Sequence, residues 1–356
     1  MARAVLTIDL DAVAANWRAL DARTAPDVET AAVVKADGYG LGAAPVAQRL
    51  RAAGARTFFT ALAEEAAALR EALGREPAIH FFSGLLPGDA ALCQSHDLIP
   101  CLNSAAQIAD FVKRLPGRPC ALQVDSGMNR LGIEADEAKS AAGLIARAAP
   151  GLVMSHLACA DTPAHPMNAA QADAFERIAA IAPRARRSLS ATGGIMLGPR
   201  WAYGLTRPGI GLYGGAPHMD ALPVVTLSLP VIQVRDMAPG ESAGYGATWT
   251  AARPSRVATL AAGYADGLIR AIGSGGVMLY AGDVACPLVG RVSMDLITVD
   301  VTDLPRVPDR LEILNARQTI DDLARAAGTI GYEILTSLGG RYDRAYKGAA
   351  PPSDPE

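Results

Sequence analysis

The sequence predicts an α/β protein, a (β/α)8 TIM-type barrel followed by a C-terminal domain of β-strands. Two observations lead to this prediction. From about residue 10 to 217, short apolar runs typical of strands alternate with alanine-rich segments typical of helices. After about residue 220 helical segments become rare, and strand-like runs follow one another with glycine and proline turns between them.

The strand candidates of the first region are mostly apolar rather than alternating, as expected of parallel strands buried on both faces. In chain order they are AAVVKA, TFFTAL, AIHFFSG, LIPCLN, CALQVDSG, LVMSHLA, RRSLSATGG and TRPGIGLYGG. Helix-like segments such as AEEAAALREAL and SAAQIADFVKRL lie between them. Eight such units fit a (β/α)8 barrel, although a doubly wound sheet has a similar pattern.

We place the barrel at residues 1–220, with about the first eight residues as candidates for pairing with the next domain. The β domain covers residues 221–348. Only one of its segments looks helical, Thr319 to Gly328, where Thr319 precedes a capping-box-like Asp322. The tail 349–356, AAPPSDPE, is too polar and proline-rich to pack, so we expect it to be disordered.

Composition excludes several classes of function. Half of the residues are hydrophobic, and 33 basic against 36 acidic residues give a net charge of −3 with neither sign clustered. This balance favours neither nucleic acid nor a membrane surface as a partner. Asp9 and Asp11 interrupt the apolar stretch that a signal peptide needs, and no apolar run reaches membrane-spanning length. Five widely spaced cysteines without a CxxC pair indicate reduced thiols, a cytoplasmic location and no metal site.

Residues with useful chemistry follow the predicted barrel strands, where the catalytic groups of such barrels lie. They are Lys35, Arg130, His156, Ser190 and Arg207. In VVKADGYG, a lysine ends an apolar run and glycines follow it. One interpretation is a loop whose lysine reaches water; the other is a buried lysine that forms a Schiff base, with the Tyr39 phenol bonded to an anion such as a phosphate.

The segment RPGIGLYGG contains the GxGxxG pattern of dinucleotide-binding loops, at Gly209, Gly211 and Gly214. Its context does not suit that function, because no apolar strand directly precedes it and no acid follows about 20 residues later. A loop that binds phosphate through backbone N–H groups after the eighth barrel strand fits better. Arg207, just before the loop, is either a surface charge or a group that faces the pocket.

Three further positions are ambiguous on the residues alone. Glycines flank Tyr245 in ESAGYGATWTA, which suggests a tight loop that presents the ring, although a packed tyrosine is the simpler interpretation. For His156 the simpler interpretation is a hydrogen-bonded core histidine. RVSMDL places Met294 and Asp295 near the middle of a strand, where an acidic side chain is unusual unless it has a partner or a function.

Taken together and in order, the motifs resemble the alanine racemases, from residue 1 to about 347. They are AVVKADGYG, VDSGMNRLG, SHLACAD, LSATGG, TRPGIGLYG, SAGYGATW, AGYADG and GRVSMD. The resemblance implies a barrel enzyme that uses pyridoxal 5'-phosphate to interconvert L-alanine and D-alanine. It implies a homodimer with active sites shared between subunits, and a role in supplying D-alanine for peptidoglycan or in alanine catabolism.

The resemblance also implies residue roles. Lys35 carries the cofactor and moves the α-proton on the face that serves D-alanine, and Tyr245 does so for L-alanine. His156 supports Tyr245 and contacts Arg207, which faces the pyridine nitrogen. The implied phosphate ligands are Tyr39, Ser190, Gly209 and Ile210. Arg130 contacts both the phenolic oxygen of the cofactor and the substrate carboxylate. The other implied substrate-site residues are Met294, Tyr264 and Asp295. The implied access channel contains Tyr264, Asp161, Arg270 and Arg291.

The chain departs from the family pattern at two positions. Gln123 stands where many members have a modified lysine that braces the arginine. Its neutral amide can orient Arg130 by hydrogen bonding but adds no negative charge, so we expect Arg130 either to be braced more weakly or to be helped by a bound anion. Gly340 stands where some members have a tyrosine near the phosphate. Either Tyr342 replaces that tyrosine or the site is more open, and a more open site would accept serine as well as alanine.

Three rival functions remain open. A fold-related decarboxylase of basic amino acids shares the barrel and the lysine but uses a cysteine-bearing motif, whereas Cys286 lies in DVACPLVG, a different setting. A non-catalytic pyridoxal-phosphate carrier lacks the β domain. A dehydrogenase rests only on the weak GxGxxG pattern.

Overall fold

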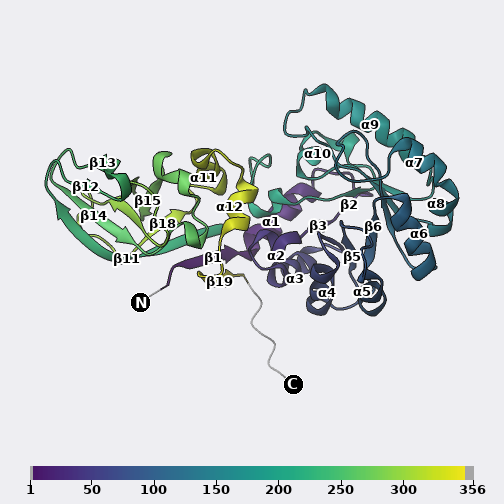
Figure 1. Ribbon diagram of the computed structural model, residues 1–356, viewed down its shortest axis with the longest axis horizontal. Helices are drawn as coiled ribbons and strands as arrows, with labels where there is room; N and C mark the ends of the chain where they lie inside the picture. Colours follow the sequence, from purple (N-terminus) through teal and green to yellow (C-terminus); the bar gives the residue numbers. More distant parts are fainter. Residues whose placement is uncertain (1–2, 349–356) are drawn as a thin grey trace, which may run out of the picture. The chain divides into compact units, whose positions relative to one another are not determined.

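The computed structural model describes residues 3–348, which form two compact units (Figure 1). The barrel unit comprises Val13–Tyr213 and Pro217–Ala221. The strand unit comprises the residues up to Ala12, Gly214–Ala216 and the residues from Leu222 onward. The tail that we expect to be disordered, 349–356, lies outside the described residues.

The barrel unit is built on a parallel sheet of seven strands in sequence order. These are β3 (Ala32–Val33), β4 (Thr57–Thr60), β5 (Ala78–Phe81), β6 (Ile99–Leu102), β7 (Ala121–Gln123), β8 (Leu152–Met154) and β9 (Arg186–Ser188). Every residue of β4, β7 and β8 is buried, so the apolar runs of the sequence do mark strands covered on both faces.

Helices lie between these strands along the chain. They are α3 (Ala43–Ala53), α4 (Ala63–Leu73), α5 (Asp89–His96), α6 (Ala105–Arg114), α7 (Ala135–Ser140), α8 (Ala142–Ala148), α9 (Pro166–Ala179) and, after the last strand, α10 (Thr192–Met196). Helix α1 (Leu10–Asp21) precedes the first strand, and α2 (Lys35–Tyr39) is a short turn with left-handed residues. In α6, for example, Ile108 and Phe111 are buried while the Ser104 hydroxyl caps the first turn by accepting from the Gln107 N–H. The strand–helix alternation predicted from the sequence is therefore present.

The eighth strand is shorter than predicted and completes the barrel through irregular pairing. β10 (Leu205–Thr206) pairs in parallel with β2 (Glu29–Thr30), just before β3. On its other side, the Gly204 N–H donates to the Arg187 carbonyl within β9 at 3.1 Å, and the Arg207 N–H donates to the Ser190 carbonyl just after β9 at 2.8 Å. The prediction of a strand through residues 206–215 is wrong beyond Thr206. Pro208 has no N–H for a ladder, and Ile210–Tyr213 form a 3-10 turn.

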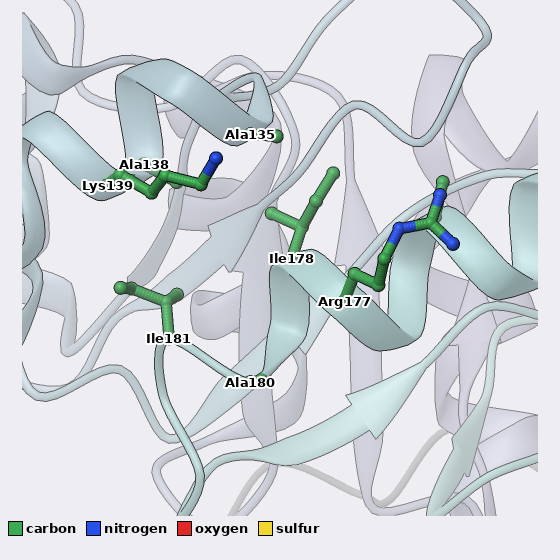
Figure 2. A pocket seen from close by; sticks show the side chains of 8 residues that line it. Ala135, Ala138, Lys139, Arg177, Ile178, Ala180 and Ile181 are labelled. Atoms are coloured by element: carbon green, nitrogen blue, oxygen red, sulfur yellow. The ribbon is translucent and has the colours of Figure 1, made fainter.

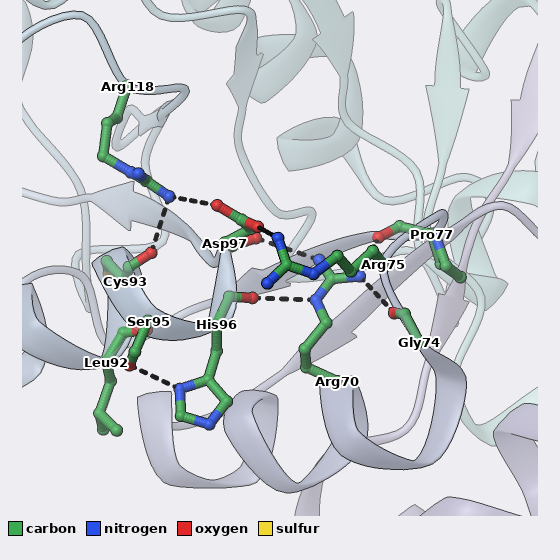
Figure 3. A network of polar contacts seen from close by, with 10 residues as sticks. All are labelled: Arg70, Gly74, Arg75, Pro77, Leu92, Cys93, Ser95, His96, Asp97 and Arg118. Carbon is green, nitrogen blue, oxygen red and sulfur yellow. Dashed lines mark hydrogen bonds and ion pairs between the residues drawn. The ribbon is translucent and has the colours of Figure 1, made fainter.

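A buried arginine ties two helix ends of the barrel unit together (Figure 3). Arg70 in α4 donates to the carbonyl oxygens of Gly74, Pro77, His96 and Asp97 at 2.8 to 3.0 Å. The last carbonyls of a helix have no partner within that helix, and a guanidinium offers five donors. Arg70 thus satisfies the ends of both α4 and α5.

The strand unit contains a mostly antiparallel eight-stranded sheet with the order β14-β17-β16-β15-β18-β11-β1-β19. Its strands are β1 (Val5–Asp9), β11 (Val225–Met237), β14 (Ser255–Leu260), β15 (Met278–Ala281), β16 (Val284–Val289), β17 (Ile297–Asp300), β18 (Arg310–Leu314) and β19 (Asp343–Lys347), and a separate pair is formed by β12 (Ser242–Ala243) and β13 (Trp249–Thr250). The N-terminal β1 pairs antiparallel with β11 and parallel with β19.

Two helices belong to the strand unit, one more than predicted. α11 (Ile320–Ala327) has the predicted capping box, in which the Asp322 carboxylate accepts from the Thr319 N–H at 2.8 Å. The expectation that this is the only helix is wrong, because α12 (Gly331–Ser337) follows it. A Cβ on Gly331 would lie 2.5 Å from the Asp321 carboxylate, so glycine permits this close packing on α11. The sequence of α12, GYEILTS, has weak helix propensity, which is why the helix was not predicted.

Candidate active site

Lys35 directly follows β3 and begins a left-handed turn. Ala36, Asp37, Gly38 and Tyr39 have φ between 52° and 63°, which is costly for residues other than glycine. The turn is held by N–H bonds from Gly38, Gly40 and Gly42 to carbonyls within it, at 2.7 to 2.9 Å. The Asp37 carboxylate also accepts from the first N–H of α3, at 2.8 Å. The chain therefore fixes the base of the Lys35 side chain instead of leaving it on a loose loop.

Burial lowers the pKa of Lys35, and the nearby positive charge of Arg130 lowers it further, while Glu65 acts in the opposite direction. The ammonium lies 5.9 Å from the ring centre of Phe82, which stacks on Phe59, which in turn stacks on His80. A lysine with a lowered pKa has more of the neutral amine that can act as a nucleophile or base. These surroundings favour the reactive interpretation of Lys35 over a lysine that reaches water.

A small cradle lies between the Lys35 turn and the loop after β10. The ring of Tyr39 stacks on that of Tyr213 at 4.5 Å, and the Tyr213 hydroxyl donates to the Val33 carbonyl at 3.0 Å. A Cβ built on Gly209 would lie 2.1 Å from the Tyr39 hydroxyl oxygen, so only glycine fits there. The phenol therefore points at the backbone of the predicted phosphate loop.

Thr192, a residue that the sequence did not single out, adds a second hydroxyl to this cradle. Thr192 Oγ1 accepts from the N–H groups of Gly209 and Gly211, at 3.1 and 3.2 Å. The predicted ligand Ser190 is fully buried and donates to the Trp201 carbonyl at 2.6 Å. Thr192, and not Ser190, thus bonds the predicted phosphate loop. The signal was present in LSATGG, where Thr192 immediately precedes two glycines.

Arg207 is 3% exposed, and its bonds are to neutral groups, the Ser188 hydroxyl and the Ser155 carbonyl. Among the described residues it forms no ion pair, although burial lowers its pKa only to about 10, so it stays charged at neutral pH. Its guanidinium carbon lies 6.0 Å from the ring centre of Phe59. A buried cation with only neutral partners in the chain is suited to bind an acceptor from outside it.

His156 follows β8 and is neutral at pH 7. Burial, together with the charges of Arg207, Arg130 and Lys35, lowers its pKa to about 3. The same three cations act on one imidazole, which indicates that all four groups share the mouth of the barrel. A neutral imidazole can accept or donate one hydrogen bond through each of its nitrogens.

Arg130 lies in an exposed loop after β7 that the Asp125 carboxylate holds. This carboxylate accepts from the N–H groups of Gly127, Met128 and Arg130, at 2.7 to 3.2 Å. The expected side-chain bond from Gln123 to Arg130 is replaced by another, because the Gln123 amide donates to the Leu131 carbonyl at 3.2 Å. Gln123 thus supports the backbone beside Arg130 and leaves the guanidinium to other partners.

Within the strand unit, Tyr245 is 71% exposed at the start of a 3-10 turn, Tyr245–Ala247. Gly244 and Gly246 on either side have φ of 77° and 73°, which requires their freedom from a side chain. A Cβ on Gly246 would lie 3.1 Å from the Arg291 guanidinium, so this predicted channel residue lies beside the tyrosine loop. The loop presents the Tyr245 ring at the surface, which agrees with the first of the two interpretations of this segment and not with a packed tyrosine.

Three further predicted residues of the strand unit, Asp295, Met294 and Tyr264, lie in two adjoining loops. The Arg341 guanidinium pairs with the carboxylates of Asp295 and Asp266 at 2.8 and 2.9 Å. The Met294 carbonyl accepts from the N–H of Ala265 at 2.9 Å, next to the half-exposed Tyr264. The carboxylate of Asp295 is thus paired with a cation of its own unit.

The structure also places Gly340, Tyr342 and two predicted channel residues. No atom lies within 4 Å of the place where a Cβ on Gly340 would be. Tyr342 is buried, and burial beside Asp266 raises the pKa of its phenol, which favours the more open site over replacement by Tyr342. Asp161 is exposed in the barrel unit, and Arg270 lines a hollow of the strand unit with Trp249 and Arg291.

Both regions of the chain match family models, alanine racemase N-terminal domain over residues 8–217 and alanine racemase C-terminal domain over residues 224–346. A curated alanine racemase from Cereibacter sphaeroides is 62% identical over 346 residues, which cover 97% of this chain and 99% of that protein. The chain belongs to the alanine racemase family. Another alanine racemase, from Rhizobium meliloti, is 46% identical with 97% of both chains covered.

Solved structures of alanine racemases share the fold. One from Bartonella henselae, with covalently bound pyridoxal phosphate, has a TM-score of 0.90 at 38% identity and covers 97% of this chain and 100% of that one. The biosynthetic alanine racemase from Pseudomonas aeruginosa has a TM-score of 0.90 at 36% identity, with 98% and 100% covered. Members of the alanine racemase family are amino-acid isomerases that use pyridoxal phosphate.

The barrel residues fit this cofactor. Its aldehyde needs an amine of lowered pKa, which Lys35 supplies. Its phosphate needs closely spaced donors, and the hydroxyls of Tyr39 and Thr192 beside Gly209 are of that kind. Its ring nitrogen is an acceptor, and Arg207 is a buried donor with only neutral partners in the chain. The donor set of the barrel mouth thus matches the three polar ends of the cofactor.

Two other observations concern features away from this mouth. A hollow between α7 and α9 is lined mainly by alanine and isoleucine, with Lys139 and Arg177 at its rim, and none of the predicted site residues lines it (Figure 2). Within residues 3–348 the structure has no helix that is both long and apolar enough to cross a membrane.

Proposed function

We propose that the protein interconverts L-alanine and D-alanine with two acid/base groups, Lys35 and Tyr245, on opposite faces of the substrate. The observation that carries the proposal is the Lys35 amine of lowered pKa, which shares the barrel mouth with a cradle suited to phosphate. Bound pyridoxal phosphate supplies the electron withdrawal that makes the α-proton of an amino acid acidic. Racemisation then requires an acid/base group on each side, because the planar carbon can be reprotonated on either face.

In this proposal the Lys35 amine removes or returns the α-proton on the face that serves D-alanine. The Tyr245 phenol does the same on the face that serves L-alanine, with the neutral His156 imidazole as its hydrogen-bond partner. A phenol of ordinary pKa near 10 is a weak base at neutral pH, so such support is needed. Arg207 directs its permanently charged guanidinium to the ring nitrogen of the cofactor, and arginine does not give up its proton.

Binding in this proposal is divided between the units. The hydroxyls of Tyr39 and Thr192 and the N–H group of Ile210 hold the phosphate, with Thr192 in place of Ser190. The Gly209 N–H stays bonded to Thr192, and the absence of a side chain at Gly209 leaves room for the Tyr39 phenol. Arg130 binds the substrate carboxylate, and the backbone at Met294 completes that site. Tyr264, Asp161, Arg270 and Arg291 border a narrow access channel.

We further propose a homodimer in which the Tyr245 of one subunit serves the Lys35 of the other. Exposed apolar side chains gather in the same part of the sequence as Tyr245, including Tyr264 and Met294, the latter 54% exposed. Such exposed apolar groups are typical of surfaces that another chain covers. Five free cysteines, four of them buried, support a location in the reducing cytoplasm.

A heavy-water assay tests the proposed reaction. The holoenzyme is incubated with L-alanine or D-alanine in heavy water, and the α-proton is followed by NMR while the enantiomers are separated by chiral chromatography. We expect loss of the α-proton together with appearance of the opposite enantiomer from both substrates. Exchange without inversion would contradict the two-base assignment, and carbon dioxide release from lysine or ornithine would instead support a decarboxylase.

Serine is a second candidate substrate because the position of Gly340 is open. We expect serine to be racemised more slowly than alanine, and Gly340→Tyr to reduce kcat/KM for serine several-fold while alanine changes less. Equal changes for both amino acids would contradict a role of this opening in substrate choice.

A further inference from the structure

Three side chains on the helices of the barrel unit form the same kind of clamp. Each belongs to the helix after one strand, binds the backbone of its own loop, and reaches the loop after the preceding strand. Glu65 in α4 accepts from the N–H groups of Ala61 and Ala36, both at 2.8 Å. The clamp therefore ties the loop after β4 to the loop that begins at Lys35.

Gln107 in α6 forms the second clamp. Its carbonyl oxygen accepts from the Asn103 N–H at 2.8 Å, and its amide donates to the Ser83 carbonyl at 3.2 Å. It joins the loops after β5 and β6. Phe82, whose ring lies 5.9 Å from the Lys35 ammonium, precedes Ser83 in the first of these loops, but neither loop contains a group to which we assign an acid/base or ligand role.

Gln171 in α9 forms the third clamp, and it is 1% exposed. Its carbonyl oxygen accepts from the Ala158 N–H at 2.8 Å, and its amide donates to the His156 carbonyl at 2.9 Å. The same amide nitrogen lies 3.5 Å from the Ser126 hydroxyl, in the loop after β7. One side chain thus fixes the backbone on both sides of Leu157, directly at the catalytic histidine.

Hydrogen bonds continue from this clamp to Arg207. The hydroxyls of Ser126 and Ser155 lie 2.8 Å apart, and the Ser155 carbonyl accepts from the Arg207 guanidinium. Ser126, Ser155 and Arg207 are all buried. In such a connected buried network, loss of one member leaves others without partners and lets the neighbouring groups shift.

We propose that Gln171 is a positioning residue for the reaction: its amide fixes His156 and, through Ser126 and Ser155, the guanidinium of Arg207. An amide suits this role because one end accepts from an N–H while the other donates to a carbonyl. Glutamate in place of Gln171 would turn a carboxylate oxygen toward the His156 carbonyl oxygen. Methionine has a volume similar to that of glutamine and would remove both hydrogen bonds. The proposal rests on the proposed racemase function of the same site.

The test compares Gln171→Met with the matched control Gln107→Met in full-length holoenzyme. Both variants lose one loop clamp, so we expect similar decreases of Tm. A shift of the catalytic groups of about 1 Å reduces turnover by up to about a hundredfold, so we expect kcat to fall about ten- to a hundredfold in Gln171→Met and less than twofold in Gln107→Met. The dissociation constant of pyridoxal phosphate should rise several-fold only in the first variant.

A readout that does not depend on turnover is the NMR spectrum of the apoprotein with labelled histidine. The chain has five histidines, and we expect the His156 ring signals to move in Gln171→Met and to stay in place in Gln107→Met. Ser126→Ala is a milder break of the same network, and it should raise the cofactor dissociation constant several-fold. Equal losses of kcat in the two methionine variants, or wild-type kcat with unmoved His156 signals in Gln171→Met, would overturn the proposal.

The failures of the two proposals are distinguishable. If the wild-type protein binds pyridoxal phosphate but does not racemise alanine, the proposed function is wrong. The His156 signals and the cofactor dissociation constant then still decide whether Gln171 positions this site.

Discussion

The barrel unit and the strand unit hold their proposed catalytic groups in opposite ways. Arg207, His156 and Lys35 sit in the barrel mouth with lowered pKa values, and the chain itself bonds the surrounding backbone. Tyr245 stands out from the strand unit with 71% of its surface exposed. In the proposed site the barrel half is thus held by bonds within its own chain, whereas the tyrosine half would need a second surface to complete it.

The largest effect is expected when the Lys35 amine is removed from the barrel half of the site. Lys35→Ala should lower kcat by at least about 10⁴-fold, because it removes both the cofactor attachment and one acid/base group. Turnover is measured by chiral chromatography in each direction. The fold should persist, so a circular-dichroism melt close to that of the wild type is the control, and residual activity within tenfold of wild type would contradict the assignment.

Tyr245→Phe removes only the hydroxyl of the exposed half. Loss of one acid/base group lowers turnover by about 10² to 10⁴-fold, and cofactor binding in the barrel should be unchanged. Exchange of the α-proton of D-alanine with heavy water should continue faster than its inversion, because Lys35 still acts on that face. If exchange and inversion fall together, Tyr245 does not serve one face alone.

The corrected phosphate cradle gives a sharper test inside the barrel. Thr192→Val removes the hydroxyl bonded to Gly209 and Gly211, so we expect about a tenfold rise in the dissociation constant of pyridoxal phosphate. Ser190→Ala removes a bond to Trp201 instead, and should lower Tm while the dissociation constant stays within about twofold. Fluorescence titration of both variants decides, and the reverse order would restore Ser190 as the ligand.

The smallest effect concerns stability in acid. Burial, together with the charges of Arg186 and Arg207, lowers the pKa of His80 to about 3, against about 6.5 in an unfolded chain. Between these values the unfolded state binds more protons, so this contribution is fully present above pH 6.5 and is lost as the pH falls toward 3. We measure the free energy of unfolding in urea at pH 6.5 and at pH 5. Its decrease over this range should be about 1 to 2 kcal/mol smaller in His80→Phe than in the wild type. Parallel losses in both proteins would contradict a neutral buried His80.

Much of the barrel could be predicted because its signals are local. Apolar runs mark the strands, and Lys35, His156 and Arg207 follow them directly. The pattern could not show that the Thr192 hydroxyl, and not that of Ser190, bonds the loop after β10, because each hydroxyl's partner is distant in sequence, Trp201 for Ser190 and Gly209 for Thr192.

Other features depend on tertiary contacts that the sequence does not display. The helix α12 forms because Gly331 packs closely on Asp321, not because its residues favour helix. Gln171 looks like a surface residue of an alanine-rich helix, and only its burial and bonds reveal the clamp. The partner of Gln123 also depends on the loop conformation, which directs its amide to Leu131 instead of Arg130.

The central claim is that one preorganised half-site and one exposed tyrosine from two different subunits make a complete site. Its most direct test is co-expression of the Lys35→Ala chain with the Tyr245→Phe chain, each nearly inactive alone. Random pairing into symmetric and mixed dimers should give the mixture about a quarter of wild-type activity, since each mixed dimer has one intact site. An inactive mixture, with mixed dimers present by mass spectrometry, would contradict the claim and place both groups in the same chain.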